Sequence, residues 1–278
     1  MFSKPIPVTF VLVSIVLLAG FFWSLHRFID SKIVTDAKTP LASVTTDDKS
    51  TTTEVKDNTA IDLSNLEIPI LMYHHIRDFS DPTDQIGINL SVSPARFASE
   101  LDLIVSKGYT TINFKDLESG RALPSKPIIL TFDDGYLNFF ANAYPELAKR
   151  KMTAVSYIIT GKVGGDYMAT SQIKDISEAG IEIGSHTISH PDLSTATAAK
   201  AHTEIFQSKV QLEAVINKPI ISFCYPSGKF NNAAVEIVRQ AGYHFAVTTV
   251  PGVAKFNDTL RLSRHRVNAD TNISTYLK

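Results

Sequence analysis

The segment from Pro127 to Gly135 constrains the fold of this chain more than any other part of the sequence. Residues 127–130 read Pro-Ile-Ile-Leu without a polar side chain, and the TFDDG sequence of Thr131–Gly135 follows directly. An apolar run of this length predicts a strand that is buried on both faces, as in a parallel sheet. Asp-Asp-Gly is favourable in turns, so this segment alone indicates either a turn or a functional site at a strand end.

The remainder of the chain predicts more strands of the same kind, alternating with helices. Alternation of this type is typical of βα units and a parallel sheet, and about seven units favour a barrel or an incomplete barrel over an open sheet. The expected strands are 68–73, 109–114, 127–132, 154–159, 181–184, 220–225, 245–250 and 260–267, and the expected helices are 94–107, 136–151, 171–179, 195–217 and 232–241.

Polar clusters follow the predicted strands. Because parallel strands all point the same way, their C-terminal ends gather these clusters on one face, whatever their separation in sequence. The sequence therefore predicts one site built from His74-His75, Asp133-Asp134, His186–His190, Tyr225–Gly228 and the surroundings of Arg264.

The N-terminal segment 1–29 predicts a membrane span. Residues from Pro5 to Leu25 include no charged side chain, and about 20 apolar residues suffice to cross a bilayer as a helix. A retained anchor is favoured over a cleaved signal peptide, because the apolar stretch is long and shows no clear A-x-A cleavage site. Basic residues on both sides leave the orientation open.

Residues 30–66 are polar and predict a flexible linker, and 67–278 predict one catalytic domain. The domain contains 21 Lys and Arg against 21 Asp and Glu, and the whole chain carries a formal net charge of −1. This balance argues against a nucleic-acid partner, which requires a basic surface. The single cysteine, Cys224, gives no information about the redox compartment.

His186 and His190 form an H-x-x-x-H pattern after a predicted strand. Two imidazoles and one aspartate make a three-ligand set with room for water, which is typical of a catalytic divalent metal site. The other aspartate of the TFDDG turn can then take a proton from that water. Adjacent carboxylates cannot flank a sugar bond at the separation that glycosidases need, so this class is disfavoured.

The sequence TFDDG at Thr131–Gly135 together with SHTISH at Ser185–His190 resembles the first two motifs of the polysaccharide deacetylases, carbohydrate esterase family 4. The resemblance covers residues 68–267. It implies a distorted (β/α)7 barrel that removes acetyl groups from N-acetylated sugar polymers. It also implies that Asp133 is the general base and that Asp134, His186 and His190 hold a divalent metal, usually zinc.

Two later motifs depart from the family pattern. The family's Arg-x-Pro-Tyr-Gly is matched here by CYPSG at Cys224–Gly228, so a cysteine replaces the arginine that normally orients the base. We expect the loop of Tyr225, Pro226 and Ser227 to contact substrate, with the N–H of Ser227 as oxyanion donor. The family's late Leu-x-His, which supplies the general acid, is replaced by residues 262–266, LSRHR.

These departures resemble the branch of bacterial poly-N-acetylglucosamine deacetylases, which has a Tyr-His motif on the first strand and an arginine on the last. We therefore expect His74 at the site near the leaving amine, and Arg264 beside Asp133. Strand alternation places His265 on the face opposite to Arg264, so the two cannot both face the site without a bulge. His265 remains the alternative general acid.

The sequence thus predicts a metal-dependent deacetylase of an N-acetylglucosamine polysaccharide, anchored in the cell membrane with its catalytic domain outside the cytoplasm. The altered motifs keep open a binding module of the same fold that has lost catalysis. An O-acetyl esterase or a peptidoglycan deacetylase is a further alternative, because specificity depends on loops such as 78–89 and 162–170.

Overall fold

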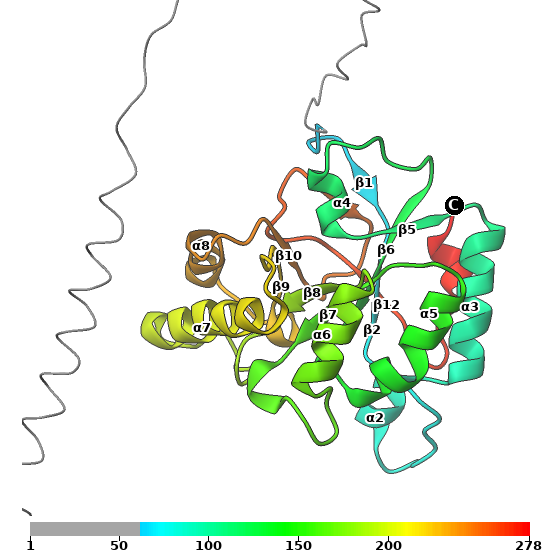
Figure 1. The fold of residues 1–278 in the computed structure, drawn as a ribbon, viewed down its shortest axis with the longest axis horizontal. Coiled ribbons are helices and arrows are strands. Elements are labelled where there is room, and N and C mark those ends of the chain that lie inside the picture. Colours follow the sequence, from blue (N-terminus) through cyan, green and yellow to red (C-terminus); the bar gives the residue numbers. More distant parts are fainter. Residues whose placement is uncertain (1–61) are drawn as a thin grey trace, which may run out of the picture. The chain divides into compact units, whose positions relative to one another are not determined.

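The computed structural model describes residues 62–278 of this chain, and Figure 1 shows their arrangement. The expected membrane segment 1–29 and nearly all of the expected linker 30–66 lie outside the described residues. Within 62–278, no helix combines the length and the apolar character that crossing a bilayer requires. Leu63 and Leu66 already pack against the core, so the last residues of the expected linker belong to the folded unit.

One parallel sheet forms the centre of the described residues. Its strands follow the order β10-β9-β8-β7-β6-β2-β12, and β5 pairs with β6 beside this path. Every pairing in this sheet is parallel, as the alternation of strands and helices predicts. The bounds are β2 (Ile70–Tyr73), β5 (Thr110–Ile112), β6 (Pro127–Phe132), β7 (Val155–Ile158), β8 (Glu182–Ser185), β9 (Ser222–Cys224), β10 (Phe245–Val247) and β12 (His265–Arg266).

The sheet curls into a half-barrel, an incomplete form of the predicted barrel, and helices cover its outer face (Figure 1). Alternate strand residues pack into two apolar clusters. The outer cluster joins the sheet to α3 (Pro94–Ser106), α5 (Tyr144–Lys149), α6 (Thr170–Glu178), α7 (Ala198–Ile216) and α8 (Asn232–Gln240). The inner cluster joins it to α4 (Phe114–Glu118), β1 (Glu67–Ile68) and β11 (Ala254–Lys255).

The inner cluster fills the half-barrel at the end where the strands begin. Ile129 of β6 and Cys224 of β9 belong to it, whereas Leu130 and Phe223 belong to the outer cluster. Successive strand residues point to opposite faces. Thr131 and Asp133 therefore continue the inner face beyond Ile129, and this alternation directs Asp133 toward the open end of the half-barrel.

Helix α3 begins where the sequence predicts. The hydroxyl of Ser93 accepts a hydrogen bond from the N–H of Arg96, and Pro94 occupies the first turn, where no backbone donor is needed. The predicted single helix over 136–151 is instead divided. A π-helix (Phe139–Ala143) precedes α5, because Pro145 lacks the N–H that a regular α-helix requires at that point.

The last predicted strand, 260–267, is shorter than expected. Only β12 is a regular strand, and it pairs with β2. The preceding residues turn toward the opposite side of the sheet, where Leu262 forms a parallel bridge with Val247. Arg264 lies between these two contacts, so its backbone is held on both sides: its N–H donates to the carbonyl of Val250 at 2.9 Å. Two further short elements, β3 (His75–Ile76) and β4 (Ser91–Val92), pair beside α2 (Gln85–Leu90).

Candidate active site

The polar clusters that follow the strands meet in a pocket of about 260 Å³. Strand ends β2, β6, β8 and β9 each deliver at least one of its residues, and α2 contributes the rim. The lining residues are His74, Ile86, Leu90, Asp133, Asp134, His186, His190, Ser227, Thr249 and Arg266.

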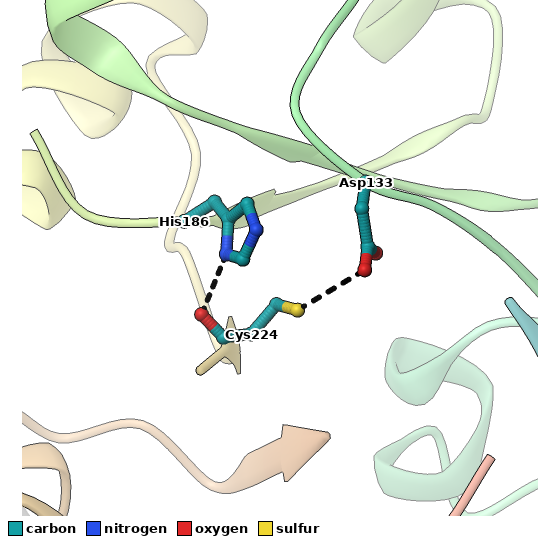
Figure 2. A group of neighbouring side chains, drawn as sticks. All are labelled: Asp133, His186 and Cys224. Atoms are coloured by element: carbon teal, nitrogen blue, oxygen red, sulfur yellow. Dashed lines mark hydrogen bonds between the residues drawn. The ribbon is translucent and has the colours of Figure 1, made fainter. Parts of the chain in front are cut away.

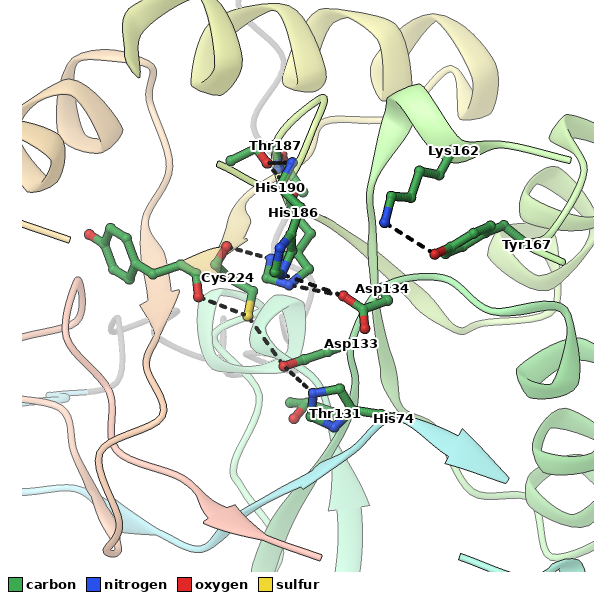
Figure 3. A network of polar contacts seen from close by, with 12 residues as sticks. His74, Thr131, Asp133, Asp134, Lys162, Tyr167, His186, Thr187, His190 and Cys224 are labelled. Carbon is green, nitrogen blue, oxygen red and sulfur yellow. Dashed lines mark hydrogen bonds and ion pairs between the residues drawn. The ribbon is translucent and has the colours of Figure 1, made fainter. Parts of the chain in front are cut away.

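Asp134, His186 and His190 bring three ligand atoms together (Figure 3). The Oδ1 atom of Asp134 lies 3.4 Å from Nε2 of His186 and 3.7 Å from Nε2 of His190. Asp134 has φ 76° and His190 has φ 60°, both in the left-handed region that side chains rarely adopt. Such conformations cluster at functional sites because surrounding contacts must maintain them.

His186 is oriented by a contact on its far side. Its Nδ1 lies 2.7 Å from the carbonyl oxygen of Cys224. A carbonyl can only accept, so Nδ1 carries a proton, and Nε2 is the ring nitrogen directed at Asp134. Metal-binding histidines are commonly fixed by a second contact of this kind.

The turn between the two histidines is held by Glu204 of α7. Its carboxylate accepts hydrogen bonds from the N–H groups of Ile188 and Ser189, at 2.9 and 2.8 Å. Sequence reasoning missed this residue. The sequence does carry a signal for it, which is a single charged residue on the buried face of a helix. Glu204 lies three residues after Ala201 and four before Ser208, and the other buried residues of this helix are uncharged.

Asp133, unlike Asp134, binds Arg264. Two parallel hydrogen bonds join them, 2.7 Å from Nη1 to Oδ1 and 2.8 Å from Nη2 to Oδ2. The guanidinium is fully buried and also donates to the Thr248 carbonyl and to Thr131. Burial raises the pKa of Asp133, but the Arg264 guanidinium outweighs burial and lowers it to about 2. Asp133 is therefore ionised at neutral pH.

Cys224 occupies the position where the family motif has arginine, and its side chain touches the same pair. Its Sγ lies 3.5 Å from Oδ2 of Asp133 and 3.3 Å from Nη2 of Arg264. The guanidinium of Arg264 therefore reaches the carboxylate from the last strand, and the cysteine leaves room for it. Strand alternation predicts from the sequence that Arg264 lies on the face of the last strand that points to the site.

A second group of potential ligands is formed by Asp133, His186 and Cys224 (Figure 2). This group is a poor cation site. Both oxygens of Asp133 already accept from Arg264, and the sulfur contacts the same guanidinium. A cation there would be repelled by a buried positive charge at short range. Among residues 62–278, no buried arginine or lysine is in contact with the three residues centred on Asp134, and they suit a divalent metal with carboxylate and imidazole ligands.

His74 lies at the other side of Asp133, with its Nε2 3.9 Å from Oδ2 (Figure 3). Burial lowers the pKa of His74 to about 4, although the charges of Asp133 and Asp134 act in the opposite direction. The imidazole is therefore neutral at neutral pH. Its Nδ1 is buried and has no hydrogen-bond partner among residues 62–278.

The remaining predicted residues divide into those inside and those outside the pocket. Ser227 lines it with φ 52°, and its N–H has no hydrogen-bond acceptor within the described part of the chain. Tyr225 and Pro226 do not line this pocket, and their expected contact with substrate stays a prediction. Strand alternation turns Tyr225 to the outer cluster, opposite to Cys224, where its hydroxyl donates to the carbonyl of Leu260.

His265 also lies outside the pocket. Its ring stacks on Tyr276, with 4.0 Å between the ring centroids. Arg266, the next residue along β12, returns to the pocket rim. The last strand thus directs Arg264 and Arg266 to the site and His265 away from it, which follows the alternation that the sequence predicts.

Comparison with known proteins supports a family assignment. The polysaccharide deacetylase family model matches residues 120–246. YxkH of Bacillus subtilis (strain 168), which is named as a polysaccharide deacetylase, is 30% identical over 213 residues, covering 75% of this chain and 73% of YxkH. The poly-beta-1,6-N-acetyl-D-glucosamine N-deacetylase of Staphylococcus aureus (strain MSSA476) is 25% identical over 227 residues, or 72% of this chain and 75% of that protein.

The fold leads to the same group. The structure of the Streptococcus pyogenes deacetylase PplD in complex with acetate superposes with a TM-score of 0.71 and 32% sequence identity, and the match covers 77% of this chain and 97% of that one. Sequence, fold and the two leading motifs agree. This chain belongs to the polysaccharide deacetylase family of hydrolases.

Proposed function

We propose that this protein is a metal-dependent deacetylase that removes N-acetyl groups from a polymer of N-acetylglucosamine. The observation that carries the proposal is the division of the adjacent aspartates. Asp134 faces two imidazole nitrogens, whereas Asp133 is held by Arg264 in a two-pronged ion pair. One carboxylate is thus available as a metal ligand and the other as a base.

A divalent ion such as Zn²⁺, held by Asp134, His186 and His190, would polarise the acetamide carbonyl and make the attacking water more acidic. Asp133 accepts a proton from that water while the water oxygen bonds to the carbonyl carbon of the acetamide. Arg264 keeps the carboxylate ionised and in a fixed orientation, because both of its oxygens are hydrogen-bonded. The N–H of Ser227 is the protein's donor to the developing oxyanion.

The leaving amine needs a proton when the carbon–nitrogen bond breaks. His74 is neutral at neutral pH, so it has a lone pair that can take the proton from Asp133 and pass it to the nitrogen. We assign His74 this relay. Its distance of 3.9 Å from Asp133 exceeds a hydrogen bond, and catalytic hydrogen bonds of free enzymes often tighten only when substrate binds. The products are acetate and a free amine on the sugar.

The substrate and location extend this proposal. N-acetylglucosamine polymer is supported by the similarity to the Staphylococcus aureus poly-beta-1,6-N-acetyl-D-glucosamine N-deacetylase. An anchored domain outside the cytoplasm is supported by the uncharged apolar run of Pro5–Leu25 and by the polar tract behind it. Extracellular glycans are accessible to a domain in that position.

The test is acetate release from β-1,6-linked N-acetylglucosamine oligomers, with and without a chelator. We expect chelation to abolish release and added Zn²⁺ to restore it. Asp134→Ala and His186→Ala should each lose bound zinc, measured by elemental analysis, and lower turnover by a factor on the order of 10³ or more. Asp175→Ala, an exposed aspartate on α6, is the matched control. Full activity in either ligand variant would rule out the metal assignment.

An O-acetylated glycan and peptidoglycan are assayed in parallel. Preference for either would keep the metal chemistry and change the proposed substrate. Glycan binding without acetate release from any of the three would favour a binding module that has lost catalysis.

A further inference from the structure

A second pocket, of about 550 Å³, is lined by residues that neighbour those of the catalytic pocket in the chain. Two short segments connect them. His74 lines the catalytic pocket and His75 lines the second, since successive residues of extended chain point in opposite directions. Likewise Asp134 lines the first and Tyr136, two residues later, lines the second. The two pockets therefore share two short stretches of backbone.

Three aromatic rings build one wall of the second pocket. The imidazole of His75 stacks on Tyr136 with 3.6 Å between centroids, and Tyr136 stacks on Tyr167 with 5.0 Å between centroids. The Nδ2 of Asn138 lies 2.8 Å from Nδ1 of His75 and fixes that ring. Tyrosines combine an apolar ring with a polar tip, which suits a ligand that has both apolar faces and hydroxyl groups.

The wall is tied to the catalytic turn by backbone contacts. Tyr136 and Tyr167 form an antiparallel bridge, and the N–H of Leu137 donates to the carbonyl of Asp166 at 2.9 Å. The N–H of Met168 donates to the carbonyl of Gly135 at 2.9 Å. These bonds fix the 162–170 loop, which the sequence singles out for specificity, against the residue that follows Asp134.

Tyr136 is the ring of the wall that follows the catalytic turn in the chain, two residues after Asp134. Burial raises the pKa of Tyr136, and the neighbouring carboxylate of Asp134 raises it further. At the opposite end of the wall, Lys162 donates to the Tyr167 hydroxyl at 3.2 Å, and Figure 3 shows this pair beyond Asp134. The aromatic wall therefore leads from the catalytic centre outward.

Two charged side chains complete the pocket, and each retains hydrogen-bonding capacity. Arg77 donates from Nε to Ser91, while its terminal nitrogens have no acceptor among the described residues. The side-chain carboxylate of Asp166 accepts no hydrogen bond from the described residues. The N–H of Leu137 donates to the backbone carbonyl of Asp166 instead. One positive and one negative group balance, which favours an uncharged ligand with vicinal donors and acceptors over an anion.

Volume indicates how the two pockets share a substrate. Small-molecule sites measure about 300–1,000 Å³. The catalytic pocket, at about 260 Å³, falls below that range, and the second pocket, at about 550 Å³, falls inside it. The catalytic pocket alone encloses too little surface to bind a glycan well.

We propose that this second pocket binds an uncharged sugar ring of the same glycan chain, next to the residue being deacetylated, with Arg77 and Asp166 as hydrogen-bonding partners and Tyr167 as the wall. The inference rests on the proposed deacetylase function and adds a length requirement to it. A single sugar fills only the catalytic pocket, whereas an oligomer fills both.

The experiment compares kcat/KM for β-1,6-linked tetra-N-acetylglucosamine with kcat/KM for the methyl glycoside of N-acetylglucosamine, using the zinc-loaded full-length chain. We expect wild type to favour the tetramer. Arg77→Ala and Asp166→Ala should each raise KM for the tetramer about tenfold with little change in kcat, because each removes one charged hydrogen-bonding partner. Tyr167→Phe should have a smaller effect, because it keeps the ring.

Arg121→Ala and Asp175→Ala are matched controls, because both residues are exposed and line neither pocket. Asp166→Ala keeps the backbone bond to Leu137, so the frame of the pocket is retained. A wild-type enzyme without length preference, or variants that slow both substrates equally, would overturn the second site.

Calorimetric titration with β-1,6-linked tetra-N-acetylglucosamine, in an Asp133→Asn background that leaves this uncharged ligand intact, separates the two proposals. Absence of acetate release together with binding that weakens in Arg77→Ala and Asp166→Ala would contradict the proposed reaction and retain the second pocket. Binding that is unchanged in both variants would refute the second pocket, whatever the enzyme's activity.

Discussion

Asp133 and Glu182 are two buried carboxylates on the inner face of the same half-barrel, at opposite ends of its strands. Asp133 follows the end of β6, whereas Glu182 begins β8. Burial raises the pKa of both groups. For Asp133 the Arg264 guanidinium reverses that effect and lowers the pKa to about 2, whereas for Glu182 burial prevails and raises it to about 7.

The partners explain the difference. Glu182 accepts hydrogen bonds from the hydroxyl of Ser222 at 2.6 Å and from the backbone N–H of Lys115 at 3.1 Å, both uncharged donors. Asp133 accepts two bonds from a cation. At Glu182 the two neutral donors do not offset the desolvation cost, whereas at Asp133 the buried opposite charge does and makes ionisation favourable at neutral pH. The end of the half-barrel where we propose that the chemistry occurs is the one that holds such a cation.

The largest expected effect separates the two carboxylates by activity. Asp133→Asn should retain bound zinc and lower turnover about 10²–10⁴-fold, because it removes the proton acceptor. Glu182→Gln should leave turnover within about twofold at pH 7.5, since Glu182 lies at the other end of the strands. Acetate release and zinc content measure both. Equal losses in the two variants would show that buried charge in general, not Asp133 in particular, supports turnover.

Removing the cation should make Asp133 an unpaired buried charge. Arg264→Met is expected to lower the free energy of unfolding by about 3–5 kcal/mol, because it leaves a desolvated carboxylate without its partner. Arg264→Lys keeps the charge but cannot form two parallel bonds, so it should recover only part of the loss. Chemical denaturation provides the measurement.

The double variant Asp133→Asn/Arg264→Met supplies the control for that comparison. It should be more stable than the sum of the two single losses predicts, because neither charge remains unpaired. Arg261→Met, an exposed arginine paired with Asp258, should cost at most about 1 kcal/mol. Strict additivity in the double variant would show that the buried pair contributes no coupling.

The raised pKa of Glu182 should make the stability of the protein depend on pH. Between pH 4.5 and about 7, the folded protein keeps the proton of Glu182 that the unfolded chain has lost. The contribution of Glu182 to stability is therefore greatest below pH 4.5, falls as the pH rises toward 7, and is constant above that. The fall amounts to about 3 kcal/mol for a shift of this size.

Glu182→Gln should remove this dependence. The stability of the variant relative to wild type should therefore be greater at pH 8 than at pH 4.5. Denaturation midpoints of wild type and variant across that range test it, with the exposed Glu178→Gln as the control. Parallel pH curves for wild type and Glu182→Gln would mean that Glu182 ionises normally despite its burial.

The smallest expected effect is at the last strand, where the alternative proton donor lies. His265→Phe should leave acetate release within about twofold of wild type, because the ring stacks on Tyr276 and phenylalanine preserves that contact. His74→Phe should reduce turnover at least tenfold by removing the relay to the amine. The reverse order would exchange the roles of the two histidines.

Local sequence determined much of this protein. The apolar run at 127–130, the TFDDG turn and the H-x-x-x-H pattern predict strand ends that gather polar groups, because side-chain period and turn chemistry act over a few residues. The same period predicts that Arg264 and Arg266 share a face and that His265 does not. Ser93 and Pro94 set the start of α3 in the same local way.

Tertiary structure decided the rest. Asp133 meets Arg264 across 131 residues, and Glu204 reaches the histidine turn from a helix 15 residues away. Tyr225 belongs to the loop motif, yet it points outward because Cys224 takes the inner face. The pocket beside the site depends on the bridge between Tyr136 and Tyr167. These contacts depend on strand order and register. Side-chain periodicity does not specify either one, because it assigns a residue to a face of the sheet and not to a neighbouring strand.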